Sequence, residues 1–197
     1  MKRYALAALA ALSLTLSLGT SLARAATEVA GIKVDERARV GNSDLVMNGA
    51  GLRTKVFFKV YVAALYLPEK AGDTAAVLAA KGPKRIAITL KRDLAAEKFV
   101  DALKEGIEKN SNETEQAAIK DRLQQFAKAM LSVGEAKEGS FVTIDWLPES
   151  GTRLSIGGQQ KGSDLPGEDF YRALLKIWLG NEPAQDDLKQ ALLGKAS

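Results

Sequence analysis

The chain has 197 residues, and its 28 lysines and arginines against 24 aspartates and glutamates give a net charge of +4. It contains no histidine and no cysteine, which excludes zinc sites built on those residues, the Ser-His-Asp triad and thiol nucleophiles. A general base would have to be a carboxylate, a lysine, a tyrosine or an ordered water.

The first 25 residues have the layout of a secretory signal peptide. A lysine and an arginine precede a largely apolar run at 4–18, and an A-x-A motif ends at residue 25. The run is shorter than the roughly 20 residues that a membrane-spanning helix needs. We therefore predict a cleaved signal peptide, residues 1–25, and a single domain, residues 26–197, that is periplasmic or secreted and has no stable membrane span.

Without this leader the net charge falls from +4 to about +1, because the leader holds Lys2, Arg3 and Arg24 and no acidic residue. Such a domain lacks the clustered basic face that nucleic acid needs. The densest basic stretch, "KGPKR" at 81–85, is expected to be a solvated turn. We predict no nucleic acid partner.

Strands are predicted through the first third of the domain. Residues 27–34 read as a short strand, "DERARVGNSD" as a polar turn, and "LVMNGAGLR" as a second strand. A third strand is counted from Val56 to Leu67, where alternate residues form one apolar and one mixed face, so both faces should be covered.

Helical and strand patterns alternate in blocks after this run. "DTAAVLAAKG" predicts a short helix, "KRIAITLKRD" a strand with one wet side, and the next residues two helices that Asp93 and Thr114 can cap. A hairpin follows, with strands at 141–147 and 152–160. A deeply buried helix then begins near Pro166, and a last short helix covers 186–193.

Strands in consecutive runs, separated by helix blocks, predict an antiparallel sheet with the helices gathered on one side, the α+β class. We expect no cofactor, because "GAGLR" lacks the third glycine of the dinucleotide fingerprint and leads into a strand. We also expect no metal site. The spacing in "GSDLPGED" does not match a calcium loop.

Arg53 is the sharpest candidate for a binding residue. If the strand continues without a bulge, Arg53, Lys59 and Tyr61 share one face. A buried, unpaired guanidinium costs roughly several kcal/mol, so Arg53 needs an anion. One possibility is that an internal Asp or Glu supplies this anion, or that the strand end is open to water and needs none. The other is a ligand carboxylate, held by the guanidinium of Arg53 with a Tyr hydroxyl as second donor.

Asp145 is the only acid inside its predicted strand. Pointing inward, it could be a base or the ion-pair partner of Arg53, and pointing outward it would be ordinary surface. The residues on its face do not decide between these readings, which stay open.

The segment "NGAGLRTKVFFKVYVAALYL" resembles the signature of the chalcone isomerase-like superfamily, in its bacterial exported branch. "FVTIDWLPESGTRLSIGG" and "DFYRALLKIWLGNEPAQDDLKQALLG" resemble that family's hairpin and C-terminal helices. The resemblance implies an open-faced β-sandwich: a large antiparallel sheet, a layer of helices on one face and a ligand cleft between them.

The same resemblance implies two kinds of function. Plant chalcone isomerases close a flavanone ring, and a plastid branch binds fatty acids through an Arg and a Tyr. The Arg of both kinds corresponds to Arg53. Tyr61 stands where the catalytic enzymes have Thr, as in the fatty-acid-binding branch.

Three functions follow from the sequence. The first is an exported, non-catalytic protein that binds a fatty acid or similar apolar carboxylate through Arg53 and Tyr61, with no catalytic residue. The alternatives are a chalcone isomerase-type isomerase, which is an intramolecular lyase, and a structural or partner-binding domain without ligand.

Overall fold

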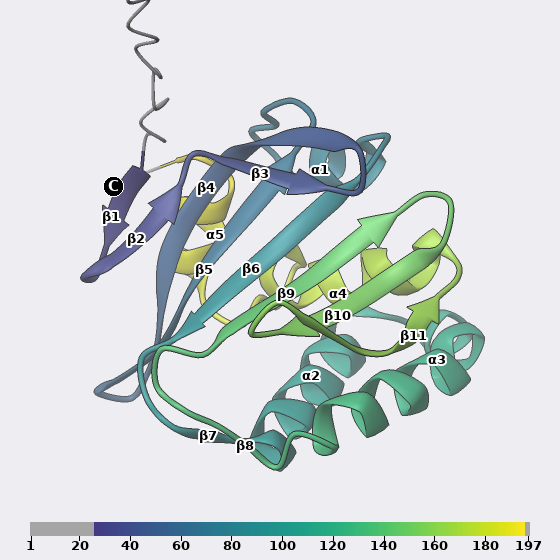
Figure 1. Ribbon diagram of the computed structural model, residues 1–197. Helices are drawn as coiled ribbons and strands as arrows, with labels where there is room; N and C mark the ends of the chain where they lie inside the picture. Colours follow the sequence, from purple (N-terminus) through teal and green to yellow (C-terminus); the bar gives the residue numbers. More distant parts are fainter. Residues whose placement is uncertain (1–25, 196–197) are drawn as a thin grey trace, which may run out of the picture.

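An antiparallel sheet organises residues 26–195, the part of the chain that this computed structural model describes. Figure 1 shows the sheet with its helices behind it. The predicted signal peptide, residues 1–25, lies outside the described residues. The seven strands of the sheet are β3 (Arg37–Val40), β4 (Ser43–Lys55), β5 (Phe58–Leu67), β6 (Lys84–Leu90), β9 (Phe141–Leu147), β10 (Gly151–Ile156) and β11 (Gln159–Leu165).

The strands lie in the order β11-β10-β9-β6-β5-β4-β3, and every neighbouring pair is antiparallel. Two further pairs stand outside the sheet. They are β1 (Ala26–Val29) with β2 (Ile32–Asp35), and β7 (Leu94–Ala95) with β8 (Glu135–Ala136).

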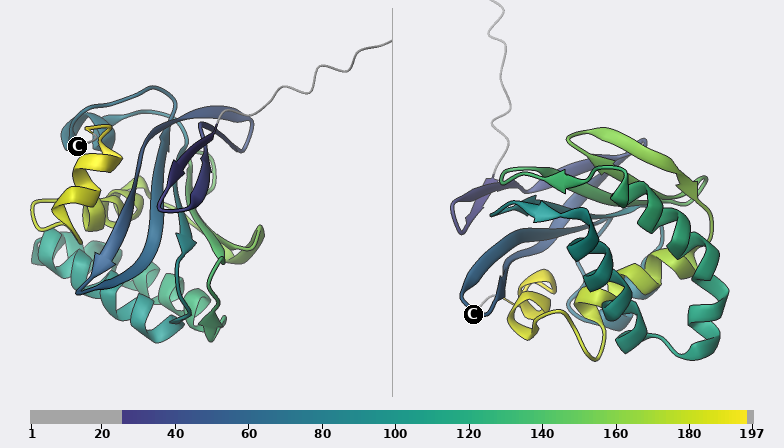
Figure 2. Two further views of the ribbon diagram at one scale, coloured as in Figure 1. Left: turned by 90° about the vertical axis from the view of Figure 1, so that its left-hand side faces the viewer. Right: turned by 90° about the horizontal axis from the view of Figure 1, so that it is seen from below.

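The described residues form five helices, and they gather on one face of the sheet, as both views of Figure 2 show. This confirms the predicted α+β class. No helix among residues 26–195 is both long and apolar enough to cross a bilayer. The helices are α1 (Thr74–Ala79), α2 (Ala96–Asn110), α3 (Glu113–Leu131), α4 (Glu168–Leu179) and α5 (Asp186–Leu192).

Each face of the sheet buries its own apolar cluster because side chains alternate along a strand. Along β5, Ala63, Leu65 and Leu67 belong to the large apolar cluster between the sheet and the helices. The opposite parity, Val62, Ala64 and Tyr66, packs beneath the β1–β2 hairpin. The prediction that both faces of this strand are covered is confirmed.

The start of the domain differs from its predicted single strand. The stretch 27–34 is a hairpin that turns at Ala30 and Gly31, both with positive φ. The supposed polar turn after it contains the edge strand β3, where Ala38 and Val40 are buried between exposed neighbours. Short strands with two apolar residues give too weak an alternation to be seen in the sequence.

Both predicted helix caps are wrong. Helix α2 begins only at Ala96, and Asp93 instead accepts hydrogen bonds from the Glu138 N–H and from Lys137. Helix α3 is capped by Asn112, whose side chain and Glu115 form a reciprocal capping box. Asn112, two residues before Thr114, has a Glu three residues after it, and this pairing makes it the better cap.

The second half of the sheet is longer than predicted. The chain turns again at Gly157-Gly158, and β11 follows as a third strand of a meander. Its sequence, "QQKGSDL", is almost wholly polar, which suits an edge strand but carries no apolar alternation.

The prediction of a solvated turn at 81–85 is wrong for its last two residues. Lys84 is fully buried at the start of β6, and its Nζ lies 2.8 Å from Glu168 Oε1 on α4. Arg85 pairs with Asp145. Partners from distant elements therefore bury two charges that look like surface charges in the sequence.

Candidate functional site

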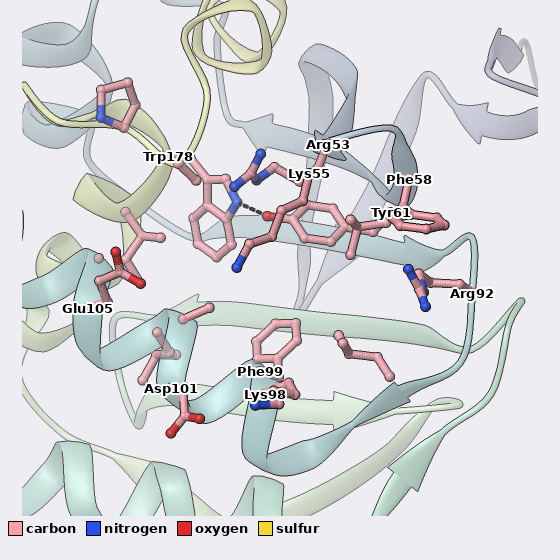
Figure 3. A pocket seen from close by; sticks show the side chains of 18 of the residues that line it. Arg53, Lys55, Phe58, Tyr61, Arg92, Lys98, Phe99, Asp101, Glu105 and Trp178 are labelled. Atoms are coloured by element: carbon pink, nitrogen blue, oxygen red, sulfur yellow. Dashed lines mark hydrogen bonds between the residues drawn. The ribbon is translucent and has the colours of Figure 1, made fainter.

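A cleft of about 730 Å³ opens between the β4–β5 hairpin and the helical layer (Figure 3). Its size falls in the range typical of small-molecule sites, roughly 300–1,000 Å³. The walls come from the hairpin, from helix α2 with the segment before it, and from the end of α4 with the residues that follow. The apolar side chains among them include Val60, Phe99, Leu103, Ile177, Trp178 and Ala184.

The register of the hairpin brings Arg53 and Tyr61 together. The two residues are direct partners across β4 and β5, but the next pair is Thr54 with Lys59, so Val60 has no partner. This β-bulge changes the alternation locally. Tyr61, Val60 and Phe58 all line the cleft, whereas Lys59 is exposed and does not. The prediction that Lys59 shares a face with Arg53 and Tyr61 fails because of the bulge.

The glycines of "GAG" let helix α5 lie directly on β4. A Cβ atom on Gly49 would stand 2.0 Å from the Ala191 carbonyl oxygen, and one on Gly51 would stand 2.7 Å from the Ala191 Cβ. Asn48 fixes this end of the helix, since its Nδ2 donates to the Leu192 carbonyl at 2.8 Å. The glycines of this motif therefore allow α5 to pack closely against β4.

Helix α5 in turn places Gln185, which orders Arg53. The Gln185 Oε1 accepts a hydrogen bond from Arg53 Nη1 at 3.2 Å and another from the Thr54 N–H at 2.8 Å. Arg53 Nη1 also donates to the Thr54 carbonyl. The guanidinium is thus held at one nitrogen by neutral groups.

Arg53 has no acidic partner among residues 26–195. It is half-buried and forms no ion pair there, and its hydrogen bonds to the Thr54 carbonyl and to Gln185 both come from Nη1. An uncompensated cation beside apolar walls favours an anion from outside the chain.

Tyr61 supplies a second donor next to Arg53. Its Oη accepts a hydrogen bond from Trp178 Nε1 at 2.9 Å, drawn as the dashed line in Figure 3. Burial raises the pKa of the Tyr61 phenol, while the bond from Trp178 and the charge of Arg53 act in the opposite direction. The phenol is therefore neutral at pH 7 and can donate its O–H. Trp178 and Arg53 have only donor groups, so the acceptor of this hydrogen bond must be another group.

Four acids line the cleft, none of them forms an ion pair with Arg53, and two of them, Asp93 and Glu105, are engaged with other partners. Lys109 lowers the pKa of Glu105 by a hydrogen bond at 2.6 Å, and the Glu138 N–H and Lys137 lower the pKa of Asp93. No group of acids within residues 26–195 is arranged to hold a metal ion. The site that remains is a pair of donors, Arg53 and Tyr61, at an apolar wall.

Asp145 does not belong to this site. Its carboxylate makes two hydrogen bonds of 2.6 Å with Nε and Nη2 of Arg85, its partner on β6. The residue is buried on the face of the sheet opposite the helices, next to Thr143 and Ala87. The hypothesis that Asp145 pairs with Arg53 is wrong, and the acid is part of the sheet.

Comparison with known protein families gives a match to the model described as chalcone isomerase-like, over residues 26–194. The chain belongs to the chalcone isomerase-like family. The crystal structure of a fatty-acid binding protein from Arabidopsis thaliana superposes with a TM-score of 0.64 at 16% identity, covering 83% of this chain and 92% of that one. Identity this low shows a shared fold. No curated protein sequence matches the chain.

For this chalcone isomerase-like chain, the sequence missed two residues of the site. Trp178 lies on the wide apolar stripe of the predicted buried helix, where nothing distinguishes a residue whose N–H meets a Tyr hydroxyl from an ordinary core residue. Gln185 follows Arg53 by more than a hundred positions and matches no motif. A buried Trp does call for a partner for its indole N–H, and that was the available signal.

Proposed function

We propose that this protein is an exported, non-catalytic binding protein for a fatty acid or a similar apolar carboxylate. One observation carries the proposal: Arg53 and Tyr61 lie side by side at a cleft with apolar side chains in its walls, and no carboxylate among the described residues pairs with the Arg53 guanidinium. A ligand carboxylate would complete both sets of hydrogen bonds.

The cleft also suits the rest of such a ligand. Apolar side chains of β5, α2 and α4 line it, and a hydrocarbon tail that displaces water from them gains roughly 25 cal/mol per Å² of buried apolar surface. The similar plant structure is described as a fatty-acid binding protein, which agrees with this reading. The leader at 1–25 supports the proposed export.

An isomerase that stabilises an oxyanion with Arg53 is the alternative within the family. It has less support here, because Tyr61 occupies the position where the resemblance places a catalytic Thr. The neutral, buried phenol of Tyr61 is a hydrogen-bond donor at pH 7, and a donor suits binding as well as it suits catalysis.

The test is to extract the purified protein with organic solvent, identify bound acids by mass spectrometry, and titrate the delipidated protein with a long-chain fatty acid. We expect a co-purifying acid, and an affinity that falls at least about tenfold in Arg53→Ala, since a charge-assisted hydrogen bond contributes about 1.5–3 kcal/mol. Arg39→Ala, at an exposed arginine of β3, is the matched control and should bind normally.

Two results would count against the proposal. One is the absence of any co-purifying acid together with equal affinity in Arg53→Ala and the unchanged protein. The other is turnover of a chalcone that disappears in Arg53→Ala, which would favour the isomerase.

A further inference from the structure

The turn between β4 and β5 exposes three apolar side chains in succession. Val56, Phe57 and Phe58 are 77%, 91% and 60% exposed. Figure 1 shows the turn projecting from one end of the sheet. A contiguous group of large apolar side chains on a surface marks an interaction site more often than isolated ones do. We call residues 55–59, "KVFFK", the hairpin tip.

The fold gains little from two of these side chains, Val56 and Phe57. Lys55 pairs with Phe58, so the turn has two central residues, and Val56 takes φ of +57°. Glycine or asparagine normally fills such a position, because a β-branched residue at positive φ is strained. Phe57 is almost fully exposed and so adds little packing. A contact of Val56 and Phe57 with a partner outside the chain would explain why apolar residues stand in this exposed turn.

Positive charges surround the apolar group. Lys55 and Lys59 flank it, and the Arg92 guanidinium lies 4.7 Å from the centre of the Phe58 ring. The acid next to Arg92, Asp93, is held by Lys137 and by the Glu138 N–H. The hairpin tip therefore presents an apolar centre with a cationic rim.

We propose that the hairpin tip docks this protein onto an anionic lipid bilayer. Aromatic and aliphatic side chains enter the boundary between headgroups and acyl chains, and lysines and arginines near an anionic surface contribute about 1 kcal/mol each. Charge complementarity favours a bilayer with negative headgroups as the occupant. The apolar residues are central and the cations peripheral, the arrangement that a headgroup layer over hydrocarbon requires.

The position of the hairpin tip gives the docking a use. Lys55, Val56 and Phe58 also line the cleft that contains Arg53. A protein docked by its tip holds the mouth of the cleft against the bilayer, so that an apolar carboxylate can pass between membrane and cleft with little exposure to water. This delivery role rests on the proposed function, whereas docking itself requires only the tip.

The experiment is flotation of the purified protein with vesicles of phosphatidylcholine alone and of phosphatidylcholine with phosphatidylglycerol. We expect binding to the anionic vesicles that weakens with salt, and weaker binding to neutral ones. Phe57→Asp should lower the partition coefficient at least about tenfold, since it exchanges an inserted ring for a repelled charge. Lys59→Gln should reduce the preference for anionic vesicles.

Neither Phe57 nor Lys59 lines the cleft, so both variants should keep the fatty-acid affinity measured in solution. Leu131→Ser, at an exposed apolar residue near the end of α3, is the control and should bind vesicles normally. The proposal is overturned if the unchanged protein ignores anionic vesicles, even where it captures a protein partner, or if Phe57→Asp binds them equally well. Vesicle binding without any fatty-acid affinity would uphold the docking and refute the proposed function.

Discussion

Arg53 and Tyr61 stand opposite each other on β4 and β5, and each is fixed from behind by a different helix. Gln185, just before α5, holds one nitrogen of Arg53, and Trp178 on α4 donates to the Tyr61 oxygen. The remaining donors of the pair point to the same cleft. Two helices that follow the hairpin by more than a hundred residues thus hold the two residues of the proposed carboxylate site.

The bond between Tyr61 and Trp178 can be tested by a double-mutant cycle. Tyr61→Phe leaves the buried Trp178 N–H without an acceptor, which should lower the free energy of unfolding by about 1–3 kcal/mol. Trp178→Phe combined with Tyr61→Phe removes the stranded donor, so the two changes should be non-additive by about 0.5–1.5 kcal/mol in urea unfolding. Strict additivity would mean that the bond does not form in solution.

The close packing of α5 on β4 predicts that alanine substitutions at two glycines differ in their effect on stability. Gly49→Ala pushes a methyl group into the backbone of Ala191 and Leu192, and we expect about 2–3 kcal/mol of destabilisation in urea unfolding, together with weaker fatty-acid binding because Gln185 shifts. Gly72→Ala is the matched control, since nothing lies within 4 Å of its added Cβ. Equal stability of the two variants would contradict the close packing of β4 against α5.

The pair formed by Asp145 and Arg85 should matter for stability and not for binding. Asp145→Ala leaves Arg85 as a partly buried cation without its partner, and we expect a loss of about 3 kcal/mol in the free energy of unfolding. Glu105→Gln breaks an exposed pair with Lys109 and should change stability little. Fatty-acid affinity should stay the same in Asp145→Ala. A large loss of affinity in this variant would mean that Asp145 contributes to the ligand site.

The helices were largely readable from the sequence because their apolar residues recur at helical spacing over several turns. Phe170, Leu174, Ile177 and Trp178 follow one stripe, and all four are buried in α4. The short or polar strands β3 and β11 were not readable, since four to seven residues with few apolar positions give no usable alternation. Residues 27–34 were readable as strand, but the turn that divides them into β1 and β2 was not.

The turn at Val56-Phe57 was missed for a physical reason. A two-residue hairpin is normally signalled by Gly or Asn, and here the tip carries a Val and a Phe in the middle of an apolar run. These same two apolar residues, in place of the usual turn residues, are the basis of the proposed docking surface. Positions where the usual turn preferences are not followed are expected at functional sites.

The candidate site was only half readable. Arg53 could be nominated from its charge beside an apolar strand, and the family resemblance added Tyr61, but their direct pairing depends on the unseen turn and on the bulge at Val60. Gln185 and Trp178 reach the site through packing between segments more than a hundred residues apart. A single sequence has no pattern that records such contacts.

The central claim, that Arg53 recognises a carboxylate, is tested most directly by measuring the affinities of one long-chain fatty acid and its methyl ester for the unchanged protein and for Arg53→Gln. The account predicts that the unchanged protein prefers the acid at least about tenfold and that Arg53→Gln loses most of this preference, because the ester keeps the tail and removes the charge. The same preference for the acid in both proteins would show that Arg53 does not hold the headgroup, and would contradict the account.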